Sequence, residues 1–150
     1  MIDKRPDLEV ILEQFLASVS TGKTEATRLR YDRVLQRLDE FMDTADAAPH
    51  LGTQLATLLA AEREFDRRRA FARLLGAEEL VCCLPGFVAD EWLGTDVSDA
   101  RAQVSLAGRL LVWLRRRQLI DMRVCACAFW EAEGAVALAR SRARGSRPVG

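Results

Sequence analysis

The most regular pattern of apolar positions lies in residues 24–42, whose spacing predicts one amphipathic helix. At 100° per residue, the apolar side chains fall within an arc of about 120°, which is the width of a face that packs on a core. The positions that share this face are Thr27, Tyr31, Val34, Leu35, Leu38, Phe41 and Met42. Thr24 stands at a suitable N-cap position, and we expect the helix to run to about Thr44.

The same spacing predicts helices on either side of this one. Residues 6–19 repeat apolar side chains at helical intervals, with a proline and an aspartate suited to the first turn. Residues 51–75 are also helical in character, but a charge-dense stretch at 62–69 leaves open one long helix or two short ones. Gly76 is expected to cap this region at its C-terminal end, and the short helix after it to end or kink before Pro85.

The second half of the chain predicts two further helices, over residues 99–118 and 122–140. Sustained period-two alternation occurs nowhere in the sequence, so no sheet is expected. The fold class predicted is all-α: a single-domain bundle of five or six helices over residues 1–139, followed by a basic flexible tail over 140–150. The side chains expected to share the core include Tyr31, Leu35, Leu38, Leu111 and Leu114.

Composition and charge fit an ordinary globular domain. The chain has 150 residues, of which 49% are apolar and 29% are charged, values typical of a soluble protein with one core. The formal net charge of zero argues against a generic polyanion binder, whose domains are usually basic. The charge is unevenly distributed, however: residues 77–100 carry −6 and residues 101–150 carry +7, so we expect a dipolar molecule.

Several kinds of chemistry are not indicated by the sequence. The first residues lack the apolar segment of a signal peptide, and no apolar run is long enough to span a membrane, so we expect a cytoplasmic protein with no membrane partner. The four cysteines form one adjacent pair and one C-x-C pair, which predicts reduced thiols and no metal site. They are Cys82, Cys83, Cys125 and Cys127.

Catalytic and nucleotide-binding motifs are also missing. The T-G-K-T sequence at 21–24 resembles part of a phosphate-binding loop, but Ala17 stands where that motif requires glycine. The single histidine, His50, has no nucleophile near it in the sequence. We therefore expect no catalytic residues, no cofactor and no enzymatic activity.

Two arginine clusters are candidate binding elements. Arg30, Arg33 and Arg37 line one flank of the helix predicted over 24–42, and a second cluster comprises Arg115, Arg116 and Arg117. A one-sided arginine strip could contact phosphate groups. The alternative is a solvated face with local ion pairs, each contributing about a few tenths of a kcal/mol.

The sequence F-L-A-S-V at 15–19, together with the helix over 24–42, resembles the N-terminal core-binding domain of tyrosine recombinases and phage integrases, a SAM-like domain. In that family a Phe-Leu pair ends the first helix, and the second helix follows the pattern S/T-x-x-T-x-x-x-Y-x-x-x-L-x-x-F/L-x-x-F-L. The matching positions here are Phe15, Leu16, Thr24, Thr27, Tyr31, Leu35, Leu38, Phe41 and Met42. A second block, at 87–93 and 98–121, resembles the closing helix of the family domain.

Two features depart from the family pattern. Residues 45–84 make a longer connection than usual, which predicts an inserted helical segment. The recombinase catalytic domain is missing as well, since the only tyrosine, Tyr31, matches a structural position in the second helix. The chain cannot be a recombinase alone.

The resemblance implies a role in clamping duplex DNA through phosphate contacts. Carried over by position, it implicates Thr24 and Thr27, with Lys23 beside them; the two arginine clusters are added by their charge pattern alone. The leading hypothesis is therefore a non-catalytic helical module that binds DNA or associates with it. The alternative, which the zero net charge favours, is a helical module that binds another protein or a second copy of itself without contacting DNA.

Overall fold

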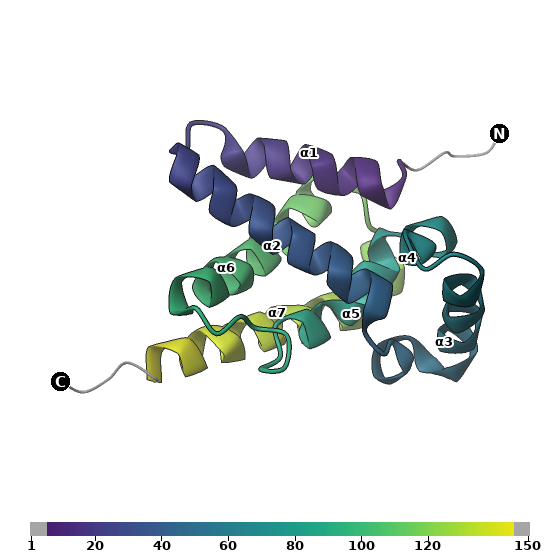
Figure 1. Ribbon diagram of the computed structural model, residues 1–150. Coiled ribbons are helices and arrows are strands. Elements are labelled where there is room, and N and C mark those ends of the chain that lie inside the picture. Colours follow the sequence, from purple (N-terminus) through teal and green to yellow (C-terminus); the bar gives the residue numbers. More distant parts are fainter. Residues whose placement is uncertain (1–5, 146–150) are drawn as a thin grey trace.

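The computed structural model describes residues 6–145, the side chains of 144 and 145 excepted, and this part of the chain is all-helical, with seven helices and no strand (Figure 1). The prediction of an all-α bundle is confirmed, although the number of helices exceeds the five or six expected. In chain order the helices are α1 (Leu8–Ser20), α2 (Glu25–Thr44), α3 (Ala48–Phe65), α4 (Ala70–Leu74), α5 (Ala77–Phe87), α6 (Val97–Arg116) and α7 (Met122–Gly145).

The first two helices form where the apolar spacing predicts them. Gly22, with φ of +75°, reverses the chain between α1 and α2, a conformation that side chains with a Cβ rarely adopt. Thr24 is the N-cap of α2, because its hydroxyl oxygen accepts a hydrogen bond from the backbone N–H of Thr27 at 3.3 Å. The start and end of α2 therefore agree with the predicted bounds.

Residues 45–84 contribute α3, α4 and most of α5. Between α3 and α4 the chain leaves the helical conformation at the charge-dense stretch, where Arg69 has φ of +65°, so two helices form rather than one. Arg63 of α3 donates hydrogen bonds to the carbonyls of Met42 (2.6 Å) and Ala45 (2.8 Å). These bonds attach α3 to the C-terminal end of α2, whose last carbonyls lack partners within the helix.

Two predictions about helix ends are wrong. Gly76 does not cap the preceding helix; it is the N-cap of α5, and its backbone N–H donates to the carboxylate of Glu79 at 3.2 Å. Helix α5 also continues through Pro85 to Phe87. Proline removes one backbone hydrogen bond there, but the turn that continues past it buries Phe87, which is 2% exposed, and this burial opposes the loss.

The two longest helices of the second half also differ at their ends. Helix α6 begins two residues before the predicted start, since Asp96 is its N-cap and accepts hydrogen bonds from the N–H groups of Ser98 (2.8 Å) and Asp99 (3.1 Å). Helix α7 continues to Gly145, beyond the boundary predicted at 139–140, with one non-helical residue at Cys125. The rest of the predicted tail, residues 146–150, lies outside the described residues.

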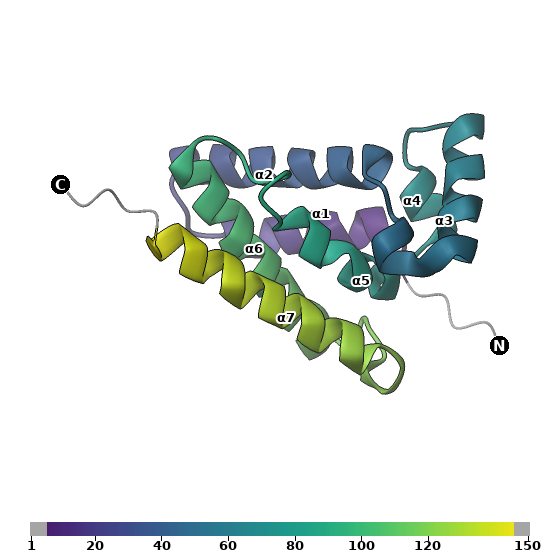
Figure 2. The ribbon, with the colours of Figure 1, turned by 90° about the horizontal axis from the view of Figure 1, so that it is seen from below.

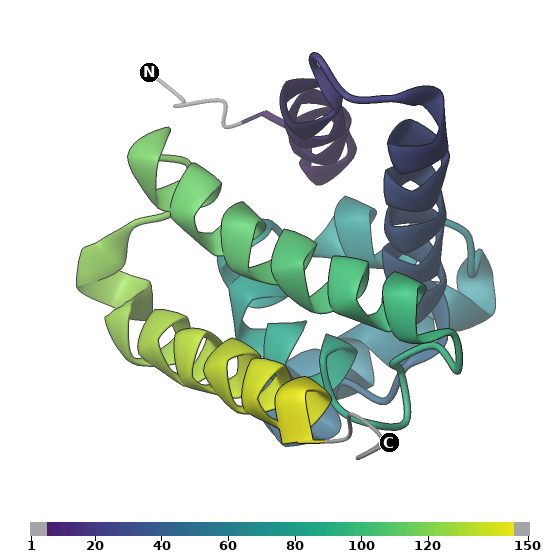
Figure 3. The same ribbon diagram turned by 90° about the vertical axis from the view of Figure 1, so that its left-hand side faces the viewer.

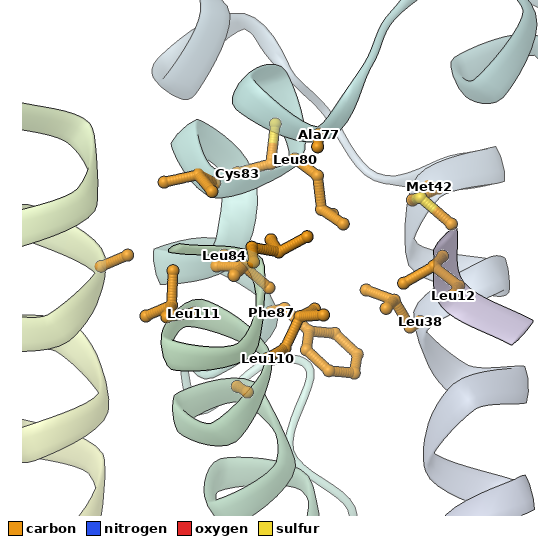
Figure 4. Close-up of a cluster of buried hydrophobic side chains, with 14 of the residues drawn as sticks. Leu12, Leu38, Met42, Ala77, Leu80, Cys83, Leu84, Phe87, Leu110 and Leu111 are labelled. Atoms are coloured by element: carbon orange, nitrogen blue, oxygen red, sulfur yellow. The ribbon is translucent and has the colours of Figure 1, made fainter. Parts of the chain in front are cut away.

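The helices surround one hydrophobic core. Figures 1 and 2 show α1 and α2 side by side, α7 on the opposite side of α5 and α6, and α3 with α4 at one end. The close-up in Figure 4 shows Leu12 and Leu38 pointing toward Leu80, Phe87 and Leu110 of α5 and α6. Of the predicted core residues, the four leucines at 35, 38, 111 and 114 are buried, and Tyr31 packs at the edge of the core.

Candidate functional site

Two arginines of the strip predicted on α2 form ion pairs with α6. Both Arg30 and Arg33 contact the carboxylate of Asp99, at 3.4 Å and 3.1 Å. Arg33 binds it through two nitrogens, since its Nε also lies 3.4 Å from Oδ2. The hydrogen bond from Arg33, together with the charges of both arginines, holds the pKa of Asp99 below its usual value. These contacts join residues 66 or more positions apart, whereas the sequence suggested only local pairs.

The third arginine of the strip, Arg37, also has an internal partner. Its Nε donates a hydrogen bond to the backbone carbonyl of Trp92, and its guanidinium lies 5.9 Å from the centre of the Trp92 ring. The carbonyl of Trp92 also accepts from Gln103 of α6 at 3.0 Å. Arg37 therefore holds α2 against the connection between α5 and α6, and the predicted strip forms a seam between these elements.

The residues implicated by the recombinase resemblance lie at the start of α2. Lys23 and Thr24 are exposed and Thr27 is partly buried. The two threonines are engaged with each other: their hydroxyl oxygens are 3.0 Å apart, in addition to the capping hydrogen bond. Their position is compatible with a surface contact, but both hydroxyls already serve to begin the helix.

The second predicted arginine cluster lies at the opposite end of α6 from Asp99. Sixteen residues separate Asp99 from Arg115, which corresponds to about 24 Å along a helix. Arg115 stacks near the rings of Phe129 and Trp130, at 5.5 and 5.4 Å, and Arg117 lies 5.0 Å from the ring of Trp113. The two predicted clusters therefore do not form one continuous patch.

A groove beside this second cluster gathers four arginines, and we call it the basic groove. It has a volume of ≈ 570 Å³. Figure 3 looks onto the side of the molecule where α6 crosses between α1 and α7, the three helices that line the groove. The lining residues are Phe15, Ser18, Val19, Gly108, Arg109, Val112, Trp113, Arg116, Arg117, Glu133, Val136, Ala137 and Arg140.

Two of these four arginines, Arg109 and Arg140, were not predicted from the sequence. Arg109 donates a hydrogen bond to the hydroxyl of Tyr31 at 3.4 Å, and Arg140 lies against Gly108, where an added Cβ would come within 2.8 Å of its Nη2 atom. Arg109 could have been found from the sequence, since it precedes Arg116 by seven residues and so shares a helix face with it. Arg140 reaches the groove only through the packing of α7 on α6, which no local pattern shows.

A second groove, between α1, α2 and α4, is acidic. We call it the acidic groove; it has a volume of ≈ 290 Å³, and its charged lining comprises Glu9, Glu13, Asp39, Asp43, Arg68 and Arg69. Arg69 pairs with Glu9 at 3.0 Å, and its backbone N–H donates to Asp43 at 3.3 Å. Asp39 is exposed as a residue, but partial desolvation of its carboxyl in the groove raises its pKa; the neighbouring carboxylates of Asp43 and Glu9 raise it further, against the opposing charge of Arg69.

Asp39→Asn should raise the free energy of unfolding at pH 7 by a few tenths of a kcal/mol, roughly the size expected at an exposed position. Because the pKa of Asp39 is raised in the folded state, its protonated form favours folding. That contribution is complete below the unfolded pKa of about 3.9 and is lost as pH rises through the folded value. The gain from the substitution should therefore vanish near pH 3.5. Denaturant unfolding at pH 7 and pH 3.5 measures this difference in stability, with Asp32→Asn on the same helix as the control. An equal gain at the two pH values would contradict a raised pKa for Asp39.

The four cysteines are free thiols in three different degrees of burial. Cys83 is buried, which raises the pKa of its thiol to about 12, and burial also raises the pKa of Cys82 and of Cys125. Cys127 is exposed. Within residues 6–145 no group of three or more histidine, cysteine, aspartate or glutamate side chains is arranged to hold a metal ion.

Comparison with known proteins found no matching family model, no matching curated protein and no matching solved structure. None of the helices in the described part of the chain is long and apolar enough to cross a membrane.

Proposed function

We propose that this chain is a non-catalytic helical module that recognises another protein, and that the basic groove is its binding surface. The observation that carries this proposal is the combination of an apolar floor with an arginine rim. Val112 and Val136 lie in the same groove as four arginines and a single glutamate. Protein interfaces characteristically enclose aromatic and aliphatic contacts within a polar rim, and arginine and tryptophan contribute most to their binding energy.

The contacts made by the arginine strip on α2 support the same proposal. Arg30, Arg33 and Arg37 are engaged with Asp99 and the Trp92 carbonyl. A ligand that recruited these arginines would have to compete with contacts that hold α2 in place. Arg116, by contrast, is exposed and lies on the groove.

Selection from a random peptide library on the immobilised protein tests the proposal. We expect selected peptides to bind the wild type and to lose about tenfold in affinity against the variant Arg116→Ala/Arg140→Ala, roughly the effect of two rim charges of 0.7 kcal/mol each. The control Arg67→Ala/Arg123→Ala removes the same charge from exposed positions outside the groove. Peptides that bind all three proteins equally, or no selected peptide at all, would contradict a protein-binding groove.

The second candidate is duplex DNA, bound through phosphate contacts. The exposed arginines on α6 and the resemblance to the recombinase core-binding domain favour it. If three to five phosphates are neutralised, log K should fall against log salt with a slope of about −3 to −5. Affinity should be almost independent of the sequence of the duplex, since phosphate contacts carry no base information.

Two sets of substitutions separate the possible DNA surfaces in a titration with labelled duplex at low salt. If α2 contacts the phosphates, losing Arg30, Arg33 and Arg37 together should flatten the salt slope. If the basic groove does, the variant Arg116→Ala/Arg140→Ala should flatten it instead. Absence of binding, or binding that neither variant changes, would exclude both DNA surfaces.

A further inference from the structure

The length of the basic groove defines the size of segment that it can hold. Along α6 and its C-cap the lining runs from Gly108 to Arg117, nine residue steps or about 14 Å of helix, and along α7 from Glu133 to Arg140, about 10 Å. A groove of this length accommodates about two and a half turns of a partner helix.

The charges are arranged at the two ends of the groove. Arg109 precedes Arg116 by seven residues on the same face of α6, which places the two backbone positions about 10.5 Å apart. Arg140 lies against Gly108, at the Arg109 end, while Arg117 follows Arg116 at the other. Each end of the groove therefore contributes two arginines.

Between these ends the floor is apolar. Val112 is 39% exposed, and Trp113 packs edge-on against Phe15 of α1, with their ring centres 5.5 Å apart. In an α-helix, residues i and i+7 share one face at the same separation of about 10.5 Å, and residues i+3 and i+4 lie between them. An acidic residue at each end and two apolar residues in the middle would match the groove in both charge and spacing.

Three of the four arginines are held by internal contacts, which reduces the entropy lost on binding. Arg117 stacks on the ring of Trp113, Arg109 donates to the Tyr31 hydroxyl, and Arg140 packs on the backbone at Gly108, which has no side chain to displace it. Duplex DNA would meet these charges but would leave the apolar floor without a partner.

We propose that the basic groove binds an acidic amphipathic helix of a partner protein, with acidic residues at positions i and i+7 and apolar residues at i+3 and i+4. This inference rests on the proposed function and specifies the chemistry of the partner. The acidic residues pair with the two arginine groups at the ends of the groove, and the apolar residues cover Val112 and Trp113. It is the helix-in-groove mode of recognition, with the charges fixing the register.

The direct test is a fluorescence anisotropy titration with a labelled 16-residue peptide that carries Glu at i and i+7 and Leu at i+3 and i+4 on an alanine and glutamine background. A peptide of the same composition in scrambled order is the matched control. We expect the patterned peptide to bind about tenfold more tightly than the scrambled one, and more weakly as salt rises. Equal affinity of the two peptides would overturn the proposal.

Charge reversal tests the register independently. The variant Arg116→Glu/Arg140→Glu leaves one arginine and one glutamate at each end, so it should lose about tenfold in affinity for the glutamate peptide and no longer prefer it to a peptide with Lys at i and i+7. The control Arg67→Glu/Arg123→Glu should leave both affinities within about twofold. Circular dichroism and thermal unfolding establish that each variant is folded. If the folded reversed variant still prefers the glutamate peptide to the lysine peptide, the proposed pairing of charges is wrong.

Backbone amide shifts in an NMR titration locate the peptide. Shifts concentrated at residues 108–117 and 133–140 are expected, and shifts concentrated elsewhere would overturn the proposal. Failure of the acidic-helix proposal can be distinguished from failure of the protein-binding function. Library peptides that need the groove arginines but are neither acidic nor helical would refute the acidic helix and leave the protein-binding function standing.

Discussion

Leu38→Ala should lower the free energy of unfolding by about 2–5 kcal/mol, through the apolar surface no longer buried and the cavity left behind. Leu38 is 3% exposed and projects from α2 into the cluster formed with α1, α5 and α6 (Figure 4). The shortened side chain would leave the aliphatic and aromatic groups around it without a contact partner. Surrounding helices can close only part of that space, because protein cores are packed to nearly crystalline density.

The matched control is Leu29→Ala on the same helix. Leu29 is 52% exposed, so its truncation should change stability by no more than about 0.5 kcal/mol. Urea unfolding followed by far-UV circular dichroism measures both variants. A loss below about 1 kcal/mol for Leu38→Ala would mean that α2 does not pack on α5 and α6 as described.

Helix positions were predictable because each helix buries one face, and burial of one face leaves a periodic signature in the sequence. The α1–α2 pair illustrates this most clearly, from the capping threonine to the end at Thr44. The predicted helix ends were wrong where the same residue type can either end one helix or begin the next. Gly76 follows an apolar run and so was predicted to end a helix, but it begins the next one, since its N–H binds Glu79.

The candidate site was less predictable, because charged side chains leave no periodic signature of their partners. The arginine strip on α2 was correctly placed on one face, but its partners, Asp99 and the Trp92 carbonyl, lie 55 or more residues further along the chain. Arg140 likewise lies against Gly108, next to Arg109 in the sequence, only because α7 folds back on α6. Long-range packing therefore decides which arginines remain exposed to a ligand.

The connection between α5 and α6 is also held by a side chain from further along the chain, Gln103. It is the only polar or charged residue among those found buried in the described chain, at 1% exposure. Its Nε2 group donates to the carbonyls of Phe87 (2.9 Å) and Trp92 (3.0 Å), which lie at and just beyond the end of α5. The Phe87 carbonyl belongs to the last turn of α5, where carbonyls lack partners within the helix, and Trp92 lies in the connection five residues further on. The Trp92 carbonyl also accepts from Arg37, so Gln103 joins α5, α6 and, through this carbonyl, α2.

Gln103→Glu should lower the free energy of unfolding at pH 7 by about 2–4 kcal/mol, because a buried charge then faces two carbonyl oxygens and the nearby Arg37 guanidinium offsets only part of that cost. The carboxylate keeps the size of the amide but has no hydrogen to donate, and it faces two carbonyl oxygens. Gln103→Leu should cost less, about 1–3 kcal/mol, because it introduces no charge and leaves only the carbonyls unsatisfied.

The pH dependence separates a lost hydrogen bond from a simple packing defect. Burial should raise the pKa of the new glutamate, and the protonated carboxyl can donate one hydrogen bond. Stability of Gln103→Glu relative to the wild type should therefore recover as pH falls through the raised pKa, whereas the deficit of Gln103→Leu should stay constant. Denaturant unfolding at pH 7 and pH 4.5 measures both. If the glutamate variant at pH 7 lies within about 1 kcal/mol of the wild type, the Gln103 amide does not hold these carbonyls, and the attachment of α6 to the end of α5 must depend on apolar packing alone.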